Sequence, residues 1–125
     1  MPIEGNHLRE YYKSGALEWD IALENKKRHG PAFCFYEAGQ IKIARTYVNG
    51  KVDGIENLFY IDGTKHMEII YVNGKLNGLS KLWYKSGQLE CEQQMKDDKR
   101  HGAFRRYDEQ GVLIFAAEFV EGKQV

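Results

Sequence analysis

Histidine, cysteine and serine are the residue types in this chain whose chemistry could bind a metal ion or supply a nucleophile. The four histidines show none of the short spacings that metal sites use: His7, His29, His66 and His101. Ser14 and Ser86 fall in turn sequences, and neither a Gly-x-Ser-x-Gly motif nor a glycine-rich phosphate loop is present. We therefore expect no catalytic residues, no metal site, no cofactor and no enzymatic activity.

Aromatic side chains are better candidates, because tyrosine and tryptophan provide rigid contact area at protein interfaces. Pairs of neighbouring aromatics recur along the chain, and their second members form the tyrosine row Tyr12, Tyr36, Tyr60 and Tyr84. Cross-strand packing inside a sheet is the alternative role for such residues. Adjacent strand residues face opposite sides, so we predict that the tyrosine row, together with Trp83, contacts a partner.

A row of lysines has the same spacing: Lys27, Lys51, Lys75, Lys99 and Lys123. A stripe of positive charge could meet an acidic protein or an anionic lipid. Solvated lysines that protect a strand edge would explain the same row without any partner. Lys51 and Lys75 follow the two Tyr-Val-Asn-Gly segments, and they are the lysines we name as candidates for binding.

The common spacing of these rows is 24 residues, and it points to a repeat architecture. Gly15, Gly39, Gly63, Gly87 and Gly111 stand 24 residues apart without an insertion. We predict a single domain over residues 1–125 that contains five repeats: 6–29, 30–53, 54–77, 78–101 and 102–125. Below, each residue is also given its position within its repeat, from 1 to 24.

Each repeat has the sequence pattern of a β-hairpin. In the first repeat Leu17, Trp19, Ile21 and Leu23 alternate with polar residues or alanine, which is the period of a half-buried strand. We expect the face that carries these four side chains to be the buried one. The glycines at position 10 and the Asn-Gly pairs at 49–50 and 73–74 mark turns that favour positive φ. The equivalent pairs at 25–26 and 97–98 contain no glycine, so for these two turns the sequence predicts a hairpin but not the turn type.

These observations predict an all-β fold. Ten main strands in sequence order would form an antiparallel β-meander, a single sheet that is twisted and possibly curled. Cys34 and Cys91 would then lie roughly 24 Å apart, too far for a disulfide. We expect two separate thiols unless the sheet curls until their strands meet.

Composition narrows the function classes. Hydrophobic residues make up 42% of the chain and aromatics 13%, too many for a disordered protein. Eighteen basic and eighteen acidic side chains cancel, so no basic footprint suggests nucleic acid. The first residues lack the basic start and apolar core of a signal peptide, and no apolar run is long enough to cross a membrane as a helix. We expect a cytoplasmic protein.

The repeated segments Tyr47–Gly54 and Tyr71–Gly78, with the aromatic pair and glycine that precede each, resemble the MORN repeat. The resemblance extends over residues 6 to 125, and it is strongest to the bacterial subtype found in small antitoxin-like and immunity-like proteins. It implies a meander of hairpins and a binding role without catalysis.

Two functional hypotheses follow. The first is an antitoxin or immunity protein that neutralises a bacterial toxin by covering it with one face of a curved sheet. The second is a structural or membrane-associated scaffold that binds anionic lipid or a protein through the lysine row. The two terminal strands, near Leu8 and Phe119, leave sheet edges that could also pair between chains as a homodimer.

Overall fold

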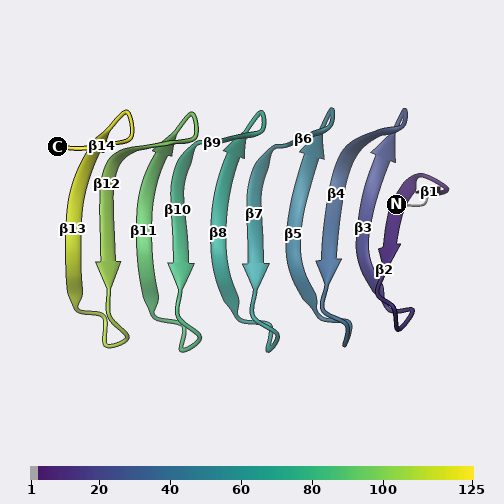
Figure 1. The fold of residues 1–125 in the computed structure, drawn as a ribbon, viewed down its shortest axis with the longest axis horizontal. Helices are drawn as coiled ribbons and strands as arrows, with labels where there is room; N and C mark the ends of the chain where they lie inside the picture. The colour runs from purple at the N-terminus through teal and green to yellow at the C-terminus, as the bar shows by residue number, and fades with distance from the viewer. Residues whose placement is uncertain (1–2) are drawn as a thin grey trace.

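The computed structural model describes residues 3–125, and its strands form one open antiparallel sheet (Figure 1). The strands follow one another across the sheet in sequence order, except that the short β6 and β9 lie beside β5 and β8. No helix occurs among residues 3–125. The prediction of an all-β meander is therefore confirmed.

The fourteen strands are short at the turns and long between them. The longer ones are His7–Tyr11 (β2), Leu17–Glu24 (β3), Lys27–Phe35 (β4), Ile41–Val48 (β5), Gly54–Phe59 (β7), Lys65–Val72 (β8), Gly78–Trp83 (β10), Leu89–Lys96 (β11), Lys99–Tyr107 (β12) and Leu113–Val120 (β13). The two-residue strands are Ile3–Glu4 (β1), Lys51–Val52 (β6), Lys75–Leu76 (β9) and Lys123–Gln124 (β14).

The turn at position 10 is the same in all five repeats. In the first, the Gly15 N–H donates to the Tyr12 carbonyl, and the Tyr12 N–H donates to the Ala16 carbonyl, both at 2.9 Å. Gly15 has φ = 92°, and its equivalents lie between 85° and 104°. This is a type I turn followed by a left-handed residue in a bulge, a geometry that glycine adopts without a Cβ penalty.

The second turn of each repeat also has one geometry, with positive φ at both central residues. Asn49 and Gly50 have φ of 49° and 85°, the values of a type I′ turn. The two turns whose type was left open adopt the same conformation without glycine. Lys26 has φ = 64° and Asp98 has φ = 69°, so both hold a side chain in the left-handed region.

The strain at Lys26 gives a stability prediction. Lys26→Gly should raise the free energy of unfolding by about 1 kcal/mol, because a left-handed residue with a Cβ costs roughly that much. Asp98→Gly is the contrast, since the Asp98 Oδ1 accepts the Leu76 N–H at 2.8 Å and that bond would be lost. Urea unfolding measures both. A loss of stability in Lys26→Gly, or an equal gain in Asp98→Gly, would contradict this explanation.

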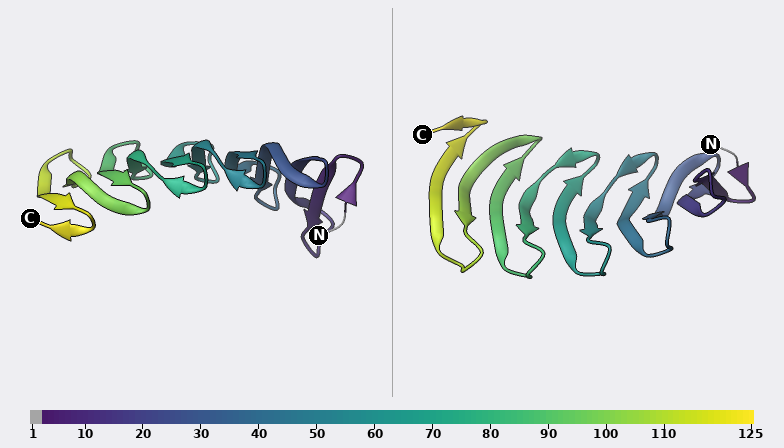
Figure 2. Two further views of the ribbon diagram at one scale, coloured as in Figure 1. Left: turned by 90° about the horizontal axis from the view of Figure 1, so that it is seen from above. Right: turned by 60° about the horizontal axis from the view of Figure 1, so that its bottom comes forward.

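The type I′ turns bond to one another along the edge of the sheet that holds β6, β9 and β14. The N–H of the second turn residue donates to a carbonyl in the preceding turn, as from Gly50 to Arg28 and from Gly74 to Val52, both at 2.8 Å. After each of these turns the chain bends before it joins the longer strand, and the long strands are bowed (Figure 2). Neighbouring repeats therefore hold each other in a curved single layer.

Few side chains are fully buried, because the sheet has one layer. Ile21 is 3% exposed and Tyr47 is 7% exposed, which confirms the predicted buried face in the first two repeats. The prediction is wrong in the last repeat, where Leu113 is 49% and Phe115 is 45% exposed. Among the described residues only the short β14 lies beyond β13, so nothing covers these side chains.

Candidate functional site

The two faces of the sheet differ in chemistry. The apolar face, as we call it, carries Leu17, Trp19, Ile21, Leu23, the equivalent residues of later repeats, and the residues directly opposite them. Its middle row crosses every strand from β3 to β13, each residue lying opposite the next: Ile21, Ala32, Arg45, Glu56, Ile69, Ser80, Gln93, Phe104 and Ala117. Ala32 is fully buried and Phe104 is 6% exposed, so this row is the centre of the packing.

The opposite face, here called the charged face, pairs its own charges. Lys81 lies directly opposite Glu68 on one side and Glu92 on the other. Arg105 also approaches Glu92, with 3.8 Å between guanidinium and carboxylate. These half-buried to exposed pairs balance the charge locally. The charged face therefore has the properties of a solvated exterior.

A buried ion pair interrupts the middle row of the apolar face. The Arg45 Nε lies 2.6 Å from the Glu56 Oε2, and the two side chains are 21% and 7% exposed. The pair is held by charge rather than by a well-aligned bond, because the Arg45 Nε–H has no hydrogen-bond acceptor. The guanidinium also lies 5.2 Å from the Trp19 ring centre and donates to the Tyr47 hydroxyl at 3.1 Å.

Burial raises the pKa of Glu56, and the attraction of Arg45 only partly opposes it. A carboxyl group with a raised folded-state pKa binds its proton more tightly when folded than when unfolded. Protonation of Glu56 therefore stabilises the folded state. This stabilisation is fully present below the ordinary pKa of 4.5 and is lost as the pH rises through the higher folded-state pKa of Glu56.

The resulting pH dependence can be isolated with Glu56→Gln. The free energy of unfolding of the wild type should fall, relative to that of Glu56→Gln, as the pH rises above about 4.5. Hydrogen bonds from Thr64 lower the pKa of Asp62 and act in the opposite direction, but they are common to both proteins and cancel in the difference. Urea unfolding across the acid range measures it. If the difference in unfolding free energy between the two proteins stays constant, or grows in favour of the wild type, the pKa of Glu56 is not raised in the folded state.

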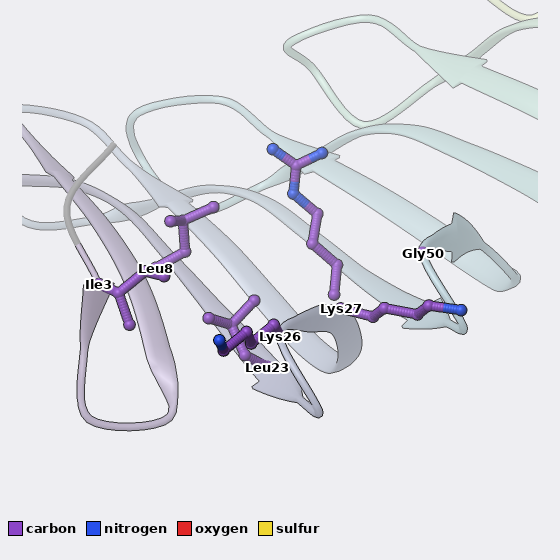
Figure 3. A pocket seen from close by; sticks show the side chains of 7 residues that line it. Ile3, Leu8, Leu23, Lys26, Lys27 and Gly50 are labelled. Carbon is purple, nitrogen blue, oxygen red and sulfur yellow. The ribbon is translucent and has the colours of Figure 1, made fainter.

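The apolar face has a hollow at its N-terminal end, of about 320 Å³ (Figure 3). Ile3, Leu8 and Leu23 supply its apolar lining, and Lys27 extends toward the turn that holds Gly50. Lys26, Lys27 and Arg28 complete the lining. Among residues 3–125 no carboxylate lies within ion-pair distance of these three cations. The hollow therefore combines apolar surface with uncompensated positive charge.

A second hollow of the same character, about 380 Å³, lies at the C-terminal end of the face. Its aromatic lining comes from Phe104, Phe115 and Phe119, whose rings meet edge to face. The Arg100 guanidinium lies 5.0 Å from the Phe104 ring centre, and that of Arg106 lies 5.8 Å from it. Neither arginine has a carboxylate partner within the described chain. Arginine over aromatic rings is the side-chain set most enriched in protein interfaces.

The tyrosine row named from the sequence connects neighbouring repeats. Each hydroxyl donates to a main-chain carbonyl 23 residues later, at 2.6 to 2.8 Å: Tyr12 to Phe35, Tyr36 to Phe59, Tyr60 to Trp83 and Tyr84 to Tyr107. The ring of Tyr60 stacks on His66, 4.3 Å between ring centres. All four rings are half-buried. The contact of this row with a partner stays a prediction.

Asp108 replaces the tyrosine in the fifth repeat, and the structure gives a local reason. The Asp108 carboxylate instead accepts the N–H groups of Gln110 and Val112, both at 2.9 Å, inside its own turn.

Of the other three predicted site residues, Trp83 adjoins that row, because its carbonyl accepts the Tyr60 hydroxyl, and Lys51 and Lys75 lie apart from it. Trp83 ends β10, and the Lys65 ammonium lies 5.7 Å from its ring centre. Lys51 and Lys75 are exposed on β6 and β9, along the edge where the type I′ turns stack. The structure therefore does not gather the predicted residues into one site, and their binding role stays a prediction.

Sequence reasoning missed a row of acceptors at position 24. The N–H of the first residue of each type I′ turn donates to the side chain at position 24 of the preceding repeat: Asn49 to His29, Asn73 to Asp53, Asp97 to Asn77 and Glu121 to His101. His29 and His101 therefore accept through Nδ1 and act in turn stacking. The sequence feature that could have indicated this role is that both histidines occupy position 24 of their repeats.

Cys34 and Cys91 are free thiols, as predicted. Burial raises the pKa of both, which disfavours the reactive thiolate. Among residues 3–125 no three histidine, cysteine or carboxylate side chains converge in a way that would hold a metal ion. The same residues include no helix that is long and apolar enough to span a membrane.

Comparison with known proteins agrees with the repeat. A family model described as a MORN repeat variant matches residues 28–49 and 76–97. The two matches start two repeats apart, and each runs from one type I′ turn through a whole hairpin to the next. No curated protein matches the sequence. MORN repeats are typically binding or scaffold modules and generally lack catalysis, and the two in-phase matches support a MORN-repeat protein.

Proposed function

We propose that this chain is a non-enzymatic protein-binding module that holds an acidic protein on its apolar face. One observation carries the proposal. Both hollows of that face combine an apolar lining with basic side chains that have no carboxylate within ion-pair distance among residues 3–125. An acidic surface with a few apolar side chains would fill them and pair their charges.

The proposed partner is a bacterial toxin, and the mechanism is occlusion. A sheet of stacked repeats offers an extended surface, which suits covering an active site or an entry surface. The toxin identity comes from the resemblance to antitoxin-like and immunity-like proteins of the same repeat type. A protein of this kind would act in the cytoplasm, before its toxin reaches a target.

The test uses the product of the gene that neighbours this one in the native host. It should be toxic when expressed alone, and co-expression of this chain should rescue growth. Arg106 and Arg105 give a matched pair, because they are adjacent on β12 and face opposite sides of the sheet. Arg106→Glu should weaken binding at least roughly tenfold, as expected for an interface arginine.

Arg105→Glu should leave the affinity within about twofold, because exposed charges outside an interface contribute little. Binding should also weaken as salt is added. Two results would overturn the proposal: no binding and no rescue by the wild type, or equal affinity for the Arg106→Glu and Arg105→Glu proteins.

A second candidate function rests on the exposed lysine row along the stacked turns. All five lysines are exposed, from Lys27 on β4 to Lys123 on β14. Such a row could bind an anionic membrane surface, at about 1 kcal/mol per lysine. Flotation with vesicles that contain phosphatidylserine, at low and high salt, separates the two functions. Salt-sensitive flotation that Lys51→Glu/Lys75→Glu abolishes would favour this candidate, and absence of flotation at low salt would remove it.

A further inference from the structure

The C-terminal strand β13 carries exposed apolar side chains on both of its faces. Phe115 is 45% exposed on the apolar face, Val120 is 48% exposed on the charged face, and Ile114, at the register shift of β13, is 56% exposed. Leu113 is exposed as well, and residues 112–117 include no charged side chain. An uncharged apolar strand at the edge of a sheet is the kind of segment that pairs with another strand.

The backbone of β13 is also open along its outer side. β12 pairs with one side of the strand, and β14 pairs with the other side only at Phe119 and Val120. The Val125 N–H donates to the Glu118 carbonyl, so that carbonyl points outward. Backbone groups alternate along a regular antiparallel strand, and those of Ala116 therefore point outward too. The N–H of Phe115 then points toward β12, so the carbonyl of Ile114, in the same planar peptide unit, points outward at the bulge. Within residues 3–125 no strand pairs with them.

The opposite edge of the sheet is protected. β1 pairs with β2 at His7 and Leu8 and covers that part of the edge. Farther along β2, Arg9 lies 3.6 Å from the Glu4 carboxylate and 3.5 Å from that of Asp20. Charges and a short covering strand are two of the devices that prevent edge pairing. Of the two edges of the sheet over residues 3–125, only the β13 edge combines apolar side chains with unpaired backbone groups.

We propose that the protein forms a twofold-symmetric dimer in which β13 pairs antiparallel with β13 of a second copy. The uncharged segment 112–117 is self-complementary, because it brings no like charges opposite each other. A register that sets Phe115 opposite Phe115 of the second copy sets Ile114 opposite Ala116. The Ala116 N–H of each copy then donates to the Ile114 carbonyl of the other, once on each side of the axis.

This pairing keeps the apolar face continuous across the two copies. Residues directly opposite each other in a sheet point to the same face, and in this register odd-numbered residues of β13 meet odd-numbered residues. Phe115 lines the C-terminal hollow, so the hollows of the two copies would lie on either side of the axis. The dimer therefore doubles the length of the apolar face.

Proline at position 15 of a repeat tests the backbone part of the proposal. Ala116→Pro removes an N–H that has no partner within the chain, which edge strands tolerate, so thermal stability should be unchanged while the dimer is lost. Ala44 occupies the same position on β5, where it pairs with Asn57 of β7. Ala44→Pro should instead lower the unfolding temperature, because proline removes a ladder hydrogen bond between two paired strands.

A charged substitution on β13 tests whether its apolar side chains stabilise the dimer. Ile114→Lys would place two lysines diagonally across the dimer axis, and it should raise the dimer dissociation constant at least roughly tenfold. Ile55→Lys is the control, because Ile55 is similarly exposed, at 51%, on β7, whose two sides are paired. Sedimentation velocity over a concentration series measures all four variants and the wild type.

The expected wild-type result is a reversible monomer–dimer equilibrium that Ala116→Pro and Ile114→Lys weaken and Ile55→Lys does not. A wild type that remains monomeric at all concentrations would overturn the proposal. A dimer unaffected by both β13 variants would also overturn it. The measurement needs no toxin, so its outcome is independent of the proposed partner.

Discussion

Glu56→Ala should lower the free energy of unfolding by about 3 kcal/mol, because it leaves the Arg45 guanidinium buried without a counter-charge. The exposed fractions of the two side chains are only 21% and 7%, so water cannot replace the lost carboxylate at little cost. Arg45→Ala should lower the free energy of unfolding by about as much, since it leaves the Glu56 carboxylate without its counter-charge and also removes the contact with Trp19. Urea unfolding measures both.

The matched double variant separates charge from packing. Arg45→Met combined with Glu56→Leu should recover most of the lost stability, because an apolar pair of similar size needs no desolvation of charge. The Lys99–Glu121 pair serves as an exposed control, with side chains 59% and 63% exposed, and Lys99→Ala should cost less than about 0.5 kcal/mol. A Glu56→Ala protein within about 1 kcal/mol of the wild type would show that the pair is not buried as described.

Removing the four tyrosine hydroxyls together should produce the second large effect. The quadruple Tyr→Phe variant at 12, 36, 60 and 84 should lose about 4 kcal/mol, or about 1 kcal/mol for each hydrogen bond to a carbonyl of the next repeat. These bonds join adjacent repeats, so the urea transition should also broaden as cooperativity between repeats falls.

Tyr11→Phe is the control for that variant. Tyr11 is 44% exposed, and its hydroxyl donates to the Glu4 carboxylate at the protein surface. Its loss should change the free energy of unfolding by less than about 0.5 kcal/mol. A quadruple variant with wild-type stability and an equally sharp transition would mean that the hydroxyls do not connect the repeats.

The sequence predicted those parts of the fold that depend on local geometry. Glycine at position 10 and Asn-Gly at 49–50 and 73–74 require positive φ, and the structure has it there. The period of two over Leu17–Leu23 predicted a strand, and β3 spans Leu17–Glu24. These features were readable because each depends on a few neighbouring residues.

Other features depend on contacts between repeats, and the sequence showed them poorly. The acceptor row at position 24 contains histidine, aspartate and asparagine, which share an acceptor atom at a similar reach but no common residue type. Glu56 occupies a repeat position where the other four repeats hold leucine, alanine, serine and phenylalanine, so burial of a charge was not expected there. Lys26 and Asp98 adopt positive φ because the stacked turns over-determine it.

The candidate site was the least predictable part. The tyrosine row was named for its chemistry, yet each hydroxyl already has a main-chain partner in the next repeat. The basic and aromatic hollow at Arg100, Arg106 and Phe119 brings together residues of two strands whose register only the fold fixes.

Hydroxyl-radical footprinting of the chain with and without its bound toxin tests most directly whether the apolar face is the binding surface. Oxidation of Leu23, Phe115 and Phe119 should fall on binding, because these side chains line the two hollows. Oxidation of Ile55 and Leu79 on the charged face should stay unchanged. Protection of Ile55 and Leu79 with none at Phe115 and Phe119 would contradict the account.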